Sequence, residues 1–234
     1  MGLDEPRVQP RPIVIAGLGA AGVAAATYSF TSALRNPAVG ADLGEPVVVA
    51  LLSNWLTASY VLCGLFAWWH RPHSRFGPLM VAAGFANFVS TLSWTTNDLT
   101  FTVGQALDFL PPVIFMHVFL AFPSGYLTRP SERSLVLGAY VAAVALQVTR
   151  MAYGGVGSNN LLEVAPDPEA ALLWLRIALV TMSGLCLAAV GLLLLGRRRR
   201  RRPLRPMFLI LEVGFTLGLL MIALLYASHL LGVS

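Results

Sequence analysis

The sequence predicts an all-α, polytopic integral membrane protein, a helical bundle of about seven transmembrane helices with a cytoplasmic N-terminus. Hydrophobic residues make up 56% of the 234 residues and charged residues 12%, whereas soluble domains average about 45–50% and about 25%. The apolar residues also gather in runs of about 20, the length at which a helix crosses a bilayer. These runs are apolar on every face, which excludes the alternating strands of a membrane barrel.

Seven such runs follow a cytoplasmic tail of residues 1–12. We expect them to form one membrane helical domain over residues 13–230, followed by a short end, residues 231–234, at which a longer protein has been truncated. The predicted spans cover residues 13–33, 47–68, 76–95, 101–122, 135–153, 172–196 and 207–230. The fifth run is the weakest, because Arg150 lies near its end, where a long side chain can reach the interface.

The first run has an alternative interpretation as a cleaved signal peptide. Arg7 and Arg11 precede it, and the alanines at positions 24–26 resemble a cleavage site. Apolar and small residues continue beyond that site, so we favour an uncleaved span.

The same run contains three glycines, Gly17, Gly19 and Gly22, in the spacing of a dinucleotide-binding motif. That motif requires a strand–turn–helix unit and an acidic residue about 20 positions later. The next acidic residue, Asp42, follows a proline and a glycine rather than a second strand. We therefore interpret the glycines as a small-residue face for close helix packing.

The basic residues predict the orientation. All 16 are arginines, and 13 of them lie in the N-terminal tail and in alternate loops. Cytoplasmic loops carry an excess of basic residues, so we expect these segments on the cytoplasmic side of the plasma membrane. The loops near Asp42, Asp98 and Glu163 are then expected on the outer side. One cytoplasmic loop is expected to contact anionic lipid headgroups rather than nucleic acid; its arginines are Arg197, Arg198, Arg199, Arg200, Arg201, Arg202 and Arg205.

Four ionisable residues within the spans form a candidate intramembrane polar network, because a charge inside a bilayer is costly unless it is paired or functional. Their depths predict two pairs, Asp108 with Arg176 and His117 with Glu212. The alternative is that they only hold the helices together. Pro111 and Pro112 lie in the middle of the fourth span, where they predict a kink and a candidate hinge.

No catalytic, metal-binding or cofactor-binding motif is visible in the sequence. Cys63 and Cys186 lie in apolar runs and are expected to be small buried residues. We therefore expect no cofactor, no metal and no catalytic activity of this chain alone.

Two stretches are similar to a known family. Residues 71–80 read RPHSRFGPLM, and residues 116–127 read MHVFLAFPSGYL. Together with the later arginine-rich loop, they resemble the N-terminal membrane-spanning sensor region of actinobacterial sensor histidine kinases. The resemblance implies a signal-input domain that acts as a homodimer on a cytoplasmic kinase core, whose phosphoacceptor and ATP-binding domains are not part of this sequence.

The alternative is a stand-alone small integral membrane protein or a transporter subunit. Transporters commonly contain internal repeats with matching broken helices, and the Pro-Pro pair occurs here within only one predicted span. The sensor interpretation is therefore favoured.

Overall fold

The structure, a computed structural model, describes residues 11–36, 45–157, 159–199 and 206–231. All regular secondary structure in these residues is helical: α1 (Pro12–Arg35), α2 (Pro46–His70), α3 (Phe76–Ser90), the short 3₁₀ helix η1 (Thr91–Trp94), α4 (Asp98–Ala106), α5 (Leu110–Ala121), α6 (Pro130–Ala152), α7 (Pro168–Arg199) and α8 (Pro206–Leu231). They provide seven segments long and apolar enough to cross a membrane, the fourth being α4 and α5 together. The predicted all-α, multi-pass architecture is confirmed.

Prolines define where several helices begin. Five helices have proline as their first residue, a position where its fixed backbone angle suits a helix and its missing N–H is not needed. One of them, α6, begins five residues before the predicted start at residue 135. The carboxylate of Glu132 explains this earlier start, because it accepts hydrogen bonds from the backbone N–H groups of Thr128 and Arg129, at 3.1 Å each.

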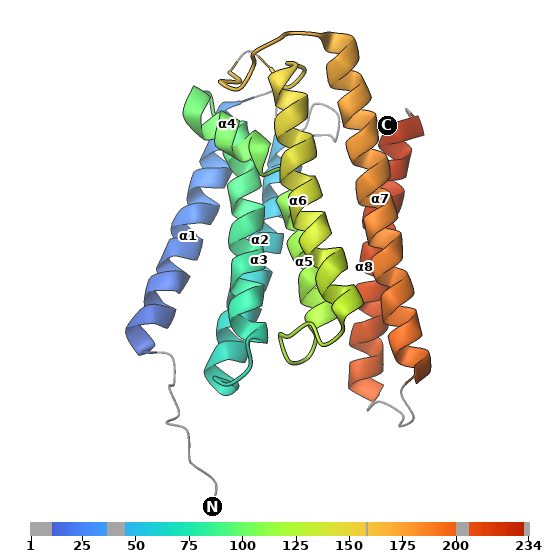
Figure 1. Ribbon diagram of the computed structural model, residues 1–234. Coiled ribbons are helices and arrows are strands. Elements are labelled where there is room, and N and C mark those ends of the chain that lie inside the picture. The colour runs from blue at the N-terminus through green and yellow to red at the C-terminus, as the bar shows by residue number, and fades with distance from the viewer. Residues whose placement is uncertain (1–10, 37–44, 158, 200–205, 232–234) are drawn as a thin grey trace, which may run out of the picture.

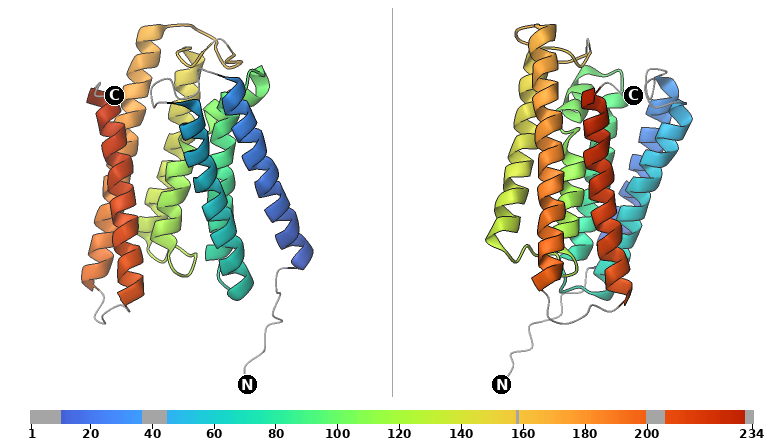
Figure 2. Two further views of the ribbon diagram at one scale, coloured as in Figure 1. Left: turned by 180° about the vertical axis from the view of Figure 1, so that it is seen from behind. Right: turned by 90° about the vertical axis from the view of Figure 1, so that its right-hand side faces the viewer.

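Helix α5 lies in the middle of the bundle (Figure 1) and contacts α3, α6, α7 and α8. Nine of its 12 residues are buried, compared with three of 24 in α1. Figure 2 shows α1 and α2 on one side of the bundle and α7 and α8 on the other. The fourth span is therefore the one best placed to couple the two sides.

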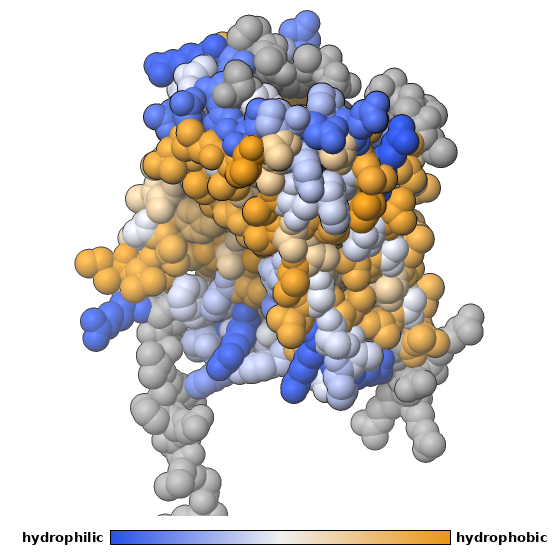
Figure 3. Space-filling model, turned by 45° about the horizontal axis from the view of Figure 1, so that its top comes forward, coloured by the Kyte–Doolittle hydropathy of each residue, from blue (hydrophilic) through white to orange (hydrophobic). Residues whose placement is uncertain are grey.

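The two ends of the bundle differ in their loops. We call the end formed by residues 71–75 and 123–133 the arginine-rich end, and the end formed by residues 91–97 and 153–167 the opposite end; α1 begins at the former (Figure 1). Apolar side chains cover the middle of the molecule and hydrophilic ones gather toward its ends (Figure 3). This distribution is the one expected of a protein that spans a bilayer.

A polar contact inside the bundle joins α2 to α3. The amide of Asn87, which is buried, donates hydrogen bonds to the backbone oxygen of Ser53 at 3.1 Å and to the hydroxyl of Thr57 at 3.0 Å. Interhelical hydrogen bonds of this kind stabilise helix pairs in membranes by about 0.6 kcal/mol each.

Two expectations for small residues change in the structure. Gly17 and Gly19 have open space around them, and only Gly22 packs closely on a neighbouring helix, against Val61. All three lie inside α1, so they do not form the strand-to-helix turn that a dinucleotide site requires. Cys186 is buried as predicted, but Cys63 is exposed, because α2 turns that residue toward the outer surface of the bundle.

Candidate functional site

The fourth span is interrupted near its middle. Helix α4 ends at Ala106 and α5 begins at Leu110, and a short turn joins them. In this turn the N–H of Asp108 donates to the oxygen of Gln105 at 3.3 Å, and the N–H of Leu110 donates to that of Leu107 at 2.9 Å. These three-residue bonds replace the four-residue bonds of a continuous helix.

The predicted hinge prolines take a different role from the one expected. Pro111 and Pro112 do not kink a continuous helix, because they are the second and third residues of a new one, α5. Their missing N–H groups carry no cost there, since the first turn of a helix does not use them. The interruption itself, at residues 107–109, is the only point where α4 and α5 are joined.

Asp108 lies at the interruption. Its side chain is exposed, although it lies close enough to Arg150 of α6 and Tyr226 of α8 for electrostatic interaction. The ring of Phe109, the next residue, meets the ring of Tyr226 edge-on with 5.9 Å between centroids. The break therefore lies next to residues of helices on two sides of α5, Arg150 of α6 and Tyr226 of α8.

The predicted pair of Asp108 with Arg176 is wrong. Among the described residues, Arg129 and Glu132 form the ion pair that the structure shows, and Asp108 is not part of it. The cation that interacts electrostatically with Asp108 is Arg150 rather than Arg176. Arg176 is exposed on α7. Matching depths in the sequence did not reveal which side of each helix faces α5.

The predicted pair of His117 with Glu212 stays a prediction. His117 lies in α5, where its Nδ1 is 3.2 Å from the hydroxyl of Tyr140. Glu212 lies in α8, but its side chain is outside the described part of the structure, as are the side chains of residues 197–202 and 205. His117 is nine residues from Asp108, about 13 Å along the helix, so the two residues do not meet in one cluster.

Hydrogen bonds between two glutamines join α6 to the end of α4, just before the break. The side-chain amide of Gln147, which is fully buried, donates to the backbone oxygen of Gln105 at 2.9 Å and lies 3.3 Å from its side-chain oxygen. This oxygen belongs to the last turn of α4, where its backbone donor is the N–H of Asp108 at 3.3 Å, so Gln147 adds a second and shorter hydrogen bond. The sequence analysis missed Gln147, although a lone amide in an apolar run was a usable signal.

The loop after α6 is attached to α4. The amide of Asn159 donates to the carboxylate of Asp98 at 2.6 Å, and the hydroxyl of Thr102 donates to the backbone oxygen of Asn159 at 3.2 Å. Arg150 donates to the backbone oxygen of Gly155 in the same loop, at 3.1 Å. The opposite end of the molecule is thus connected both to α4 and to the cation that acts on Asp108.

The described side chains contain no cluster of three or more histidine, cysteine or acidic residues able to hold a metal ion. The arrangement at the break is one carboxylate at an interrupted helix, with a cation and a tyrosine on neighbouring helices. Comparisons of this chain with protein-family models, with curated proteins and with solved structures found no match, so its function has to be inferred from its own residues.

Proposed function

We propose that this chain is the membrane-embedded signal-input domain of a two-component-type histidine kinase of the plasma membrane. The observation that carries the proposal is the interruption of the central span at Asp108. A carboxylate within a membrane span is expensive, and an interrupted helix lacks backbone hydrogen bonds, so both features together favour a functional role over a purely structural one.

A route for a signal follows from the contacts around α4. The loop at the opposite end is bound to α4 through Asn159 and Thr102, and α4 is joined to α5 only by the turn at residues 107–109. A change in that loop would shift α4 relative to α5. Because α5 contacts four other helices, including α8, such a shift would reach α8, from which an eighth span would lead to a cytoplasmic kinase core.

The same proposal includes the expected partners. A homodimer and contact of the 197–205 arginines with anionic lipid headgroups are what the family resemblance and the basic loop predict. Many large apolar side chains are exposed on α1 and α2, which provides surface for lipid or for a second copy.

Reading the gene beyond the codon for Ser234 tests the kinase part of the proposal. We expect an open frame that continues through an eighth span into a phosphoacceptor helix and an ATP-binding domain. A stop codon directly after Ser234, with nothing kinase-like following, would contradict it.

The role of Asp108 is tested with the complete gene product in lipid nanodiscs. We expect Asp108→Asn to change the rate of ATP-dependent autophosphorylation severalfold, because it removes the charge on which Arg150 acts. Glu169→Gln is the matched control, since Glu169 is an exposed acidic residue at the start of α7, away from the break. Equal rates in wild type and both variants would remove Asp108 from the signalling route.

A transporter subunit is the second candidate, and the broken span favours it, because transporters often bind ions at interrupted helices. Among the described spans only the fourth is divided into two α-helices, whereas inverted repeats would supply a second broken helix. Proteoliposome flux that is lost in Asp108→Asn, without any kinase output, would favour this candidate over the sensor.

A further inference from the structure

Residues 71–80 and 116–127, the two stretches on which the resemblance to sensor kinases rests, meet at the arginine-rich end. The hydroxyl of Ser74 donates to the backbone oxygen of Ser124 at 3.0 Å. Gly125 adopts a φ of 81° and lies directly against the backbone of Arg75 and Phe76, where any Cβ would collide. The two loops therefore pack together into one continuous surface.

A pocket of about 680 Å³ lies between these loops and α6. Its polar lining includes Arg75, Arg133 and His117, and its apolar lining includes Pro78, Leu79 and Leu127. The two arginines come from loop and helix-start positions, whereas His117 lies on α5 about a turn before its end. The pocket thus combines cationic groups at the end of the bundle with apolar walls that continue into it.

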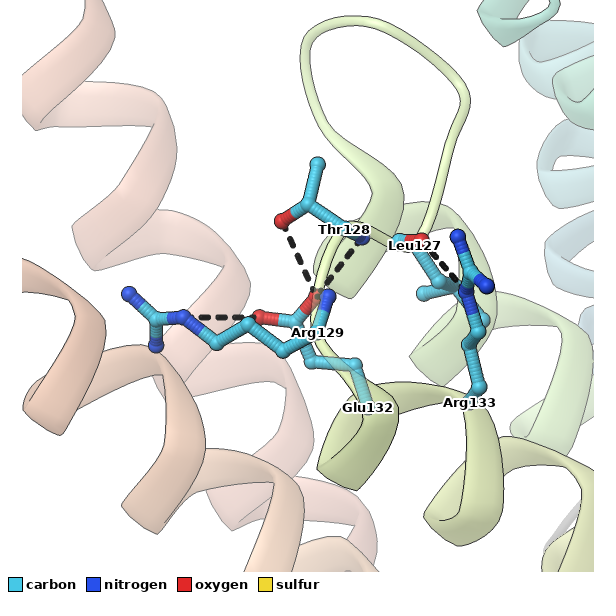
Figure 4. A network of polar contacts seen from close by, with 5 residues as sticks. All are labelled: Leu127, Thr128, Arg129, Glu132 and Arg133. Carbon is cyan, nitrogen blue, oxygen red and sulfur yellow. Dashed lines mark hydrogen bonds and ion pairs between the residues drawn. The ribbon is translucent and has the colours of Figure 1, made fainter.

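Local contacts hold both guanidinium groups in place. The Nε of Arg133 donates to the backbone oxygen of Leu127 at 3.0 Å (Figure 4). The guanidinium of Arg75 lies 5.0 Å from the centre of the Tyr126 ring, a cation–π arrangement. These contacts reduce the freedom that an incoming ligand would otherwise have to restrict.

Neither arginine is neutralised by an acidic side chain in the described part of the chain. The nearest acidic residue in sequence, Glu132, is buried and forms an ion pair with Arg129 (Figure 4). It also accepts the backbone hydrogen bonds that begin α6. Two fixed guanidinium groups therefore line one pocket without a counter-charge.

We propose that this pocket binds the phosphate group of an anionic membrane lipid. Guanidinium groups bind phosphate through paired, charge-assisted hydrogen bonds, which two arginines on one pocket can supply together. The apolar walls fit the part of an amphipathic ligand that enters the bilayer, and the lining joins residues of the charged end to residues within α3 and α5. Its arginines, Arg75 and Arg133, are not part of the run at residues 197–205.

Binding is measured on the whole chain purified in a neutral detergent, with dioctanoyl phosphatidylglycerol as the probe. We expect saturable binding that weakens at least about tenfold in Arg75→Gln/Arg133→Gln, because each variant removes charge-assisted hydrogen bonds. Arg71→Gln is the matched control: Arg71 is an exposed arginine of the same loop but does not line the pocket. It is expected to bind like wild type.

Binding measurements with other ligands identify the source of the phosphate. Inorganic phosphate binding as tightly as the lipid would assign the pocket to a soluble phosphate and overturn the lipid. Dioctanoyl phosphatidylcholine binding equally well, or an equal loss in Arg71→Gln, would overturn a specific anion site. If the double variant does not fold, Arg133→Gln alone is the test, because Arg133 is exposed at the start of α6; unchanged binding in that variant would likewise overturn the proposal.

Discussion

Gly104 shows how closely one residue fixes α4 against its neighbour. A Cβ on Gly104 would collide with the backbone of Leu92 and Ser93 in η1, and backbone atoms cannot move aside as a side-chain end can. Gly104→Ala is therefore expected to lower the free energy of unfolding by about 1–3 kcal/mol, as overpacked substitutions do. The midpoint of SDS-induced unfolding of the purified protein measures it.

Gly138 on α6 is the control for that prediction. It has open space around it, so Gly138→Ala adds a better helix former without a collision and is expected to stabilise the protein by about 0.5–1 kcal/mol. If Gly104→Ala and Gly138→Ala changed the free energy of unfolding in the same direction, the close packing of α4 on η1 would be contradicted.

At the scale of single residues, the sequence identified charges but not their neighbours. Asp108 and His117 stood out because they interrupt apolar runs. Arg150 was assigned to the membrane surface, and the structure shows that it also acts on Asp108. Depth along a helix can be counted from the sequence, whereas the direction in which a side chain points depends on which helices pack together.

Among the elements, the broken fourth span carries the proposed signal route. Its sequence predicted an irregularity but not the form that the irregularity takes. The proline pair correctly marked an irregularity, but the sequence could not distinguish a kink from two separate helices. The difference depends on tertiary partners, because Gln147 of α6 supplies a hydrogen bond to the end of α4. The bounds of the other spans were predictable to within about five residues, because each span coincides with a long apolar run.

Restoring backbone donors should close the break. Pro111→Ala/Pro112→Ala supplies N–H groups that can bond to the backbone oxygens of residues 107 and 108, so a continuous helix becomes available. We expect slower hydrogen–deuterium exchange in a peptide covering residues 105–114. Pro130→Ala, at the first position of α6, is the control and should leave that peptide unchanged. Unaltered exchange in the double variant would mean that the contacts of Gln147 alone maintain the break.

At the scale of the whole molecule, the seven-span architecture followed directly from composition and run length. The structure adds that α5 is the central helix. The sequence of one span cannot show this, because apolar residues suit both contact with lipid and a protein core. The pocket at the arginine-rich end is also a property of the assembled bundle, since its lining comes from two separate stretches of the sequence, residues 75–79 and 117–133.

The orientation of the bundle is the prediction on which both proposals depend. With 13 of 16 arginines in the N-terminal tail and alternate loops, and about 1 kcal/mol gained per arginine near an anionic inner surface, the arginine-rich end is expected in the cytoplasm. In a Cys63→Ala/Cys186→Ala background, Glu163→Cys should react with a membrane-impermeant maleimide in intact cells, and Ser131→Cys only after permeabilisation; both positions are exposed. The reverse pattern would place the loop bound to α4 in the cytoplasm and the pocket outside, so that neither an external input nor an inner-leaflet lipid could act as proposed.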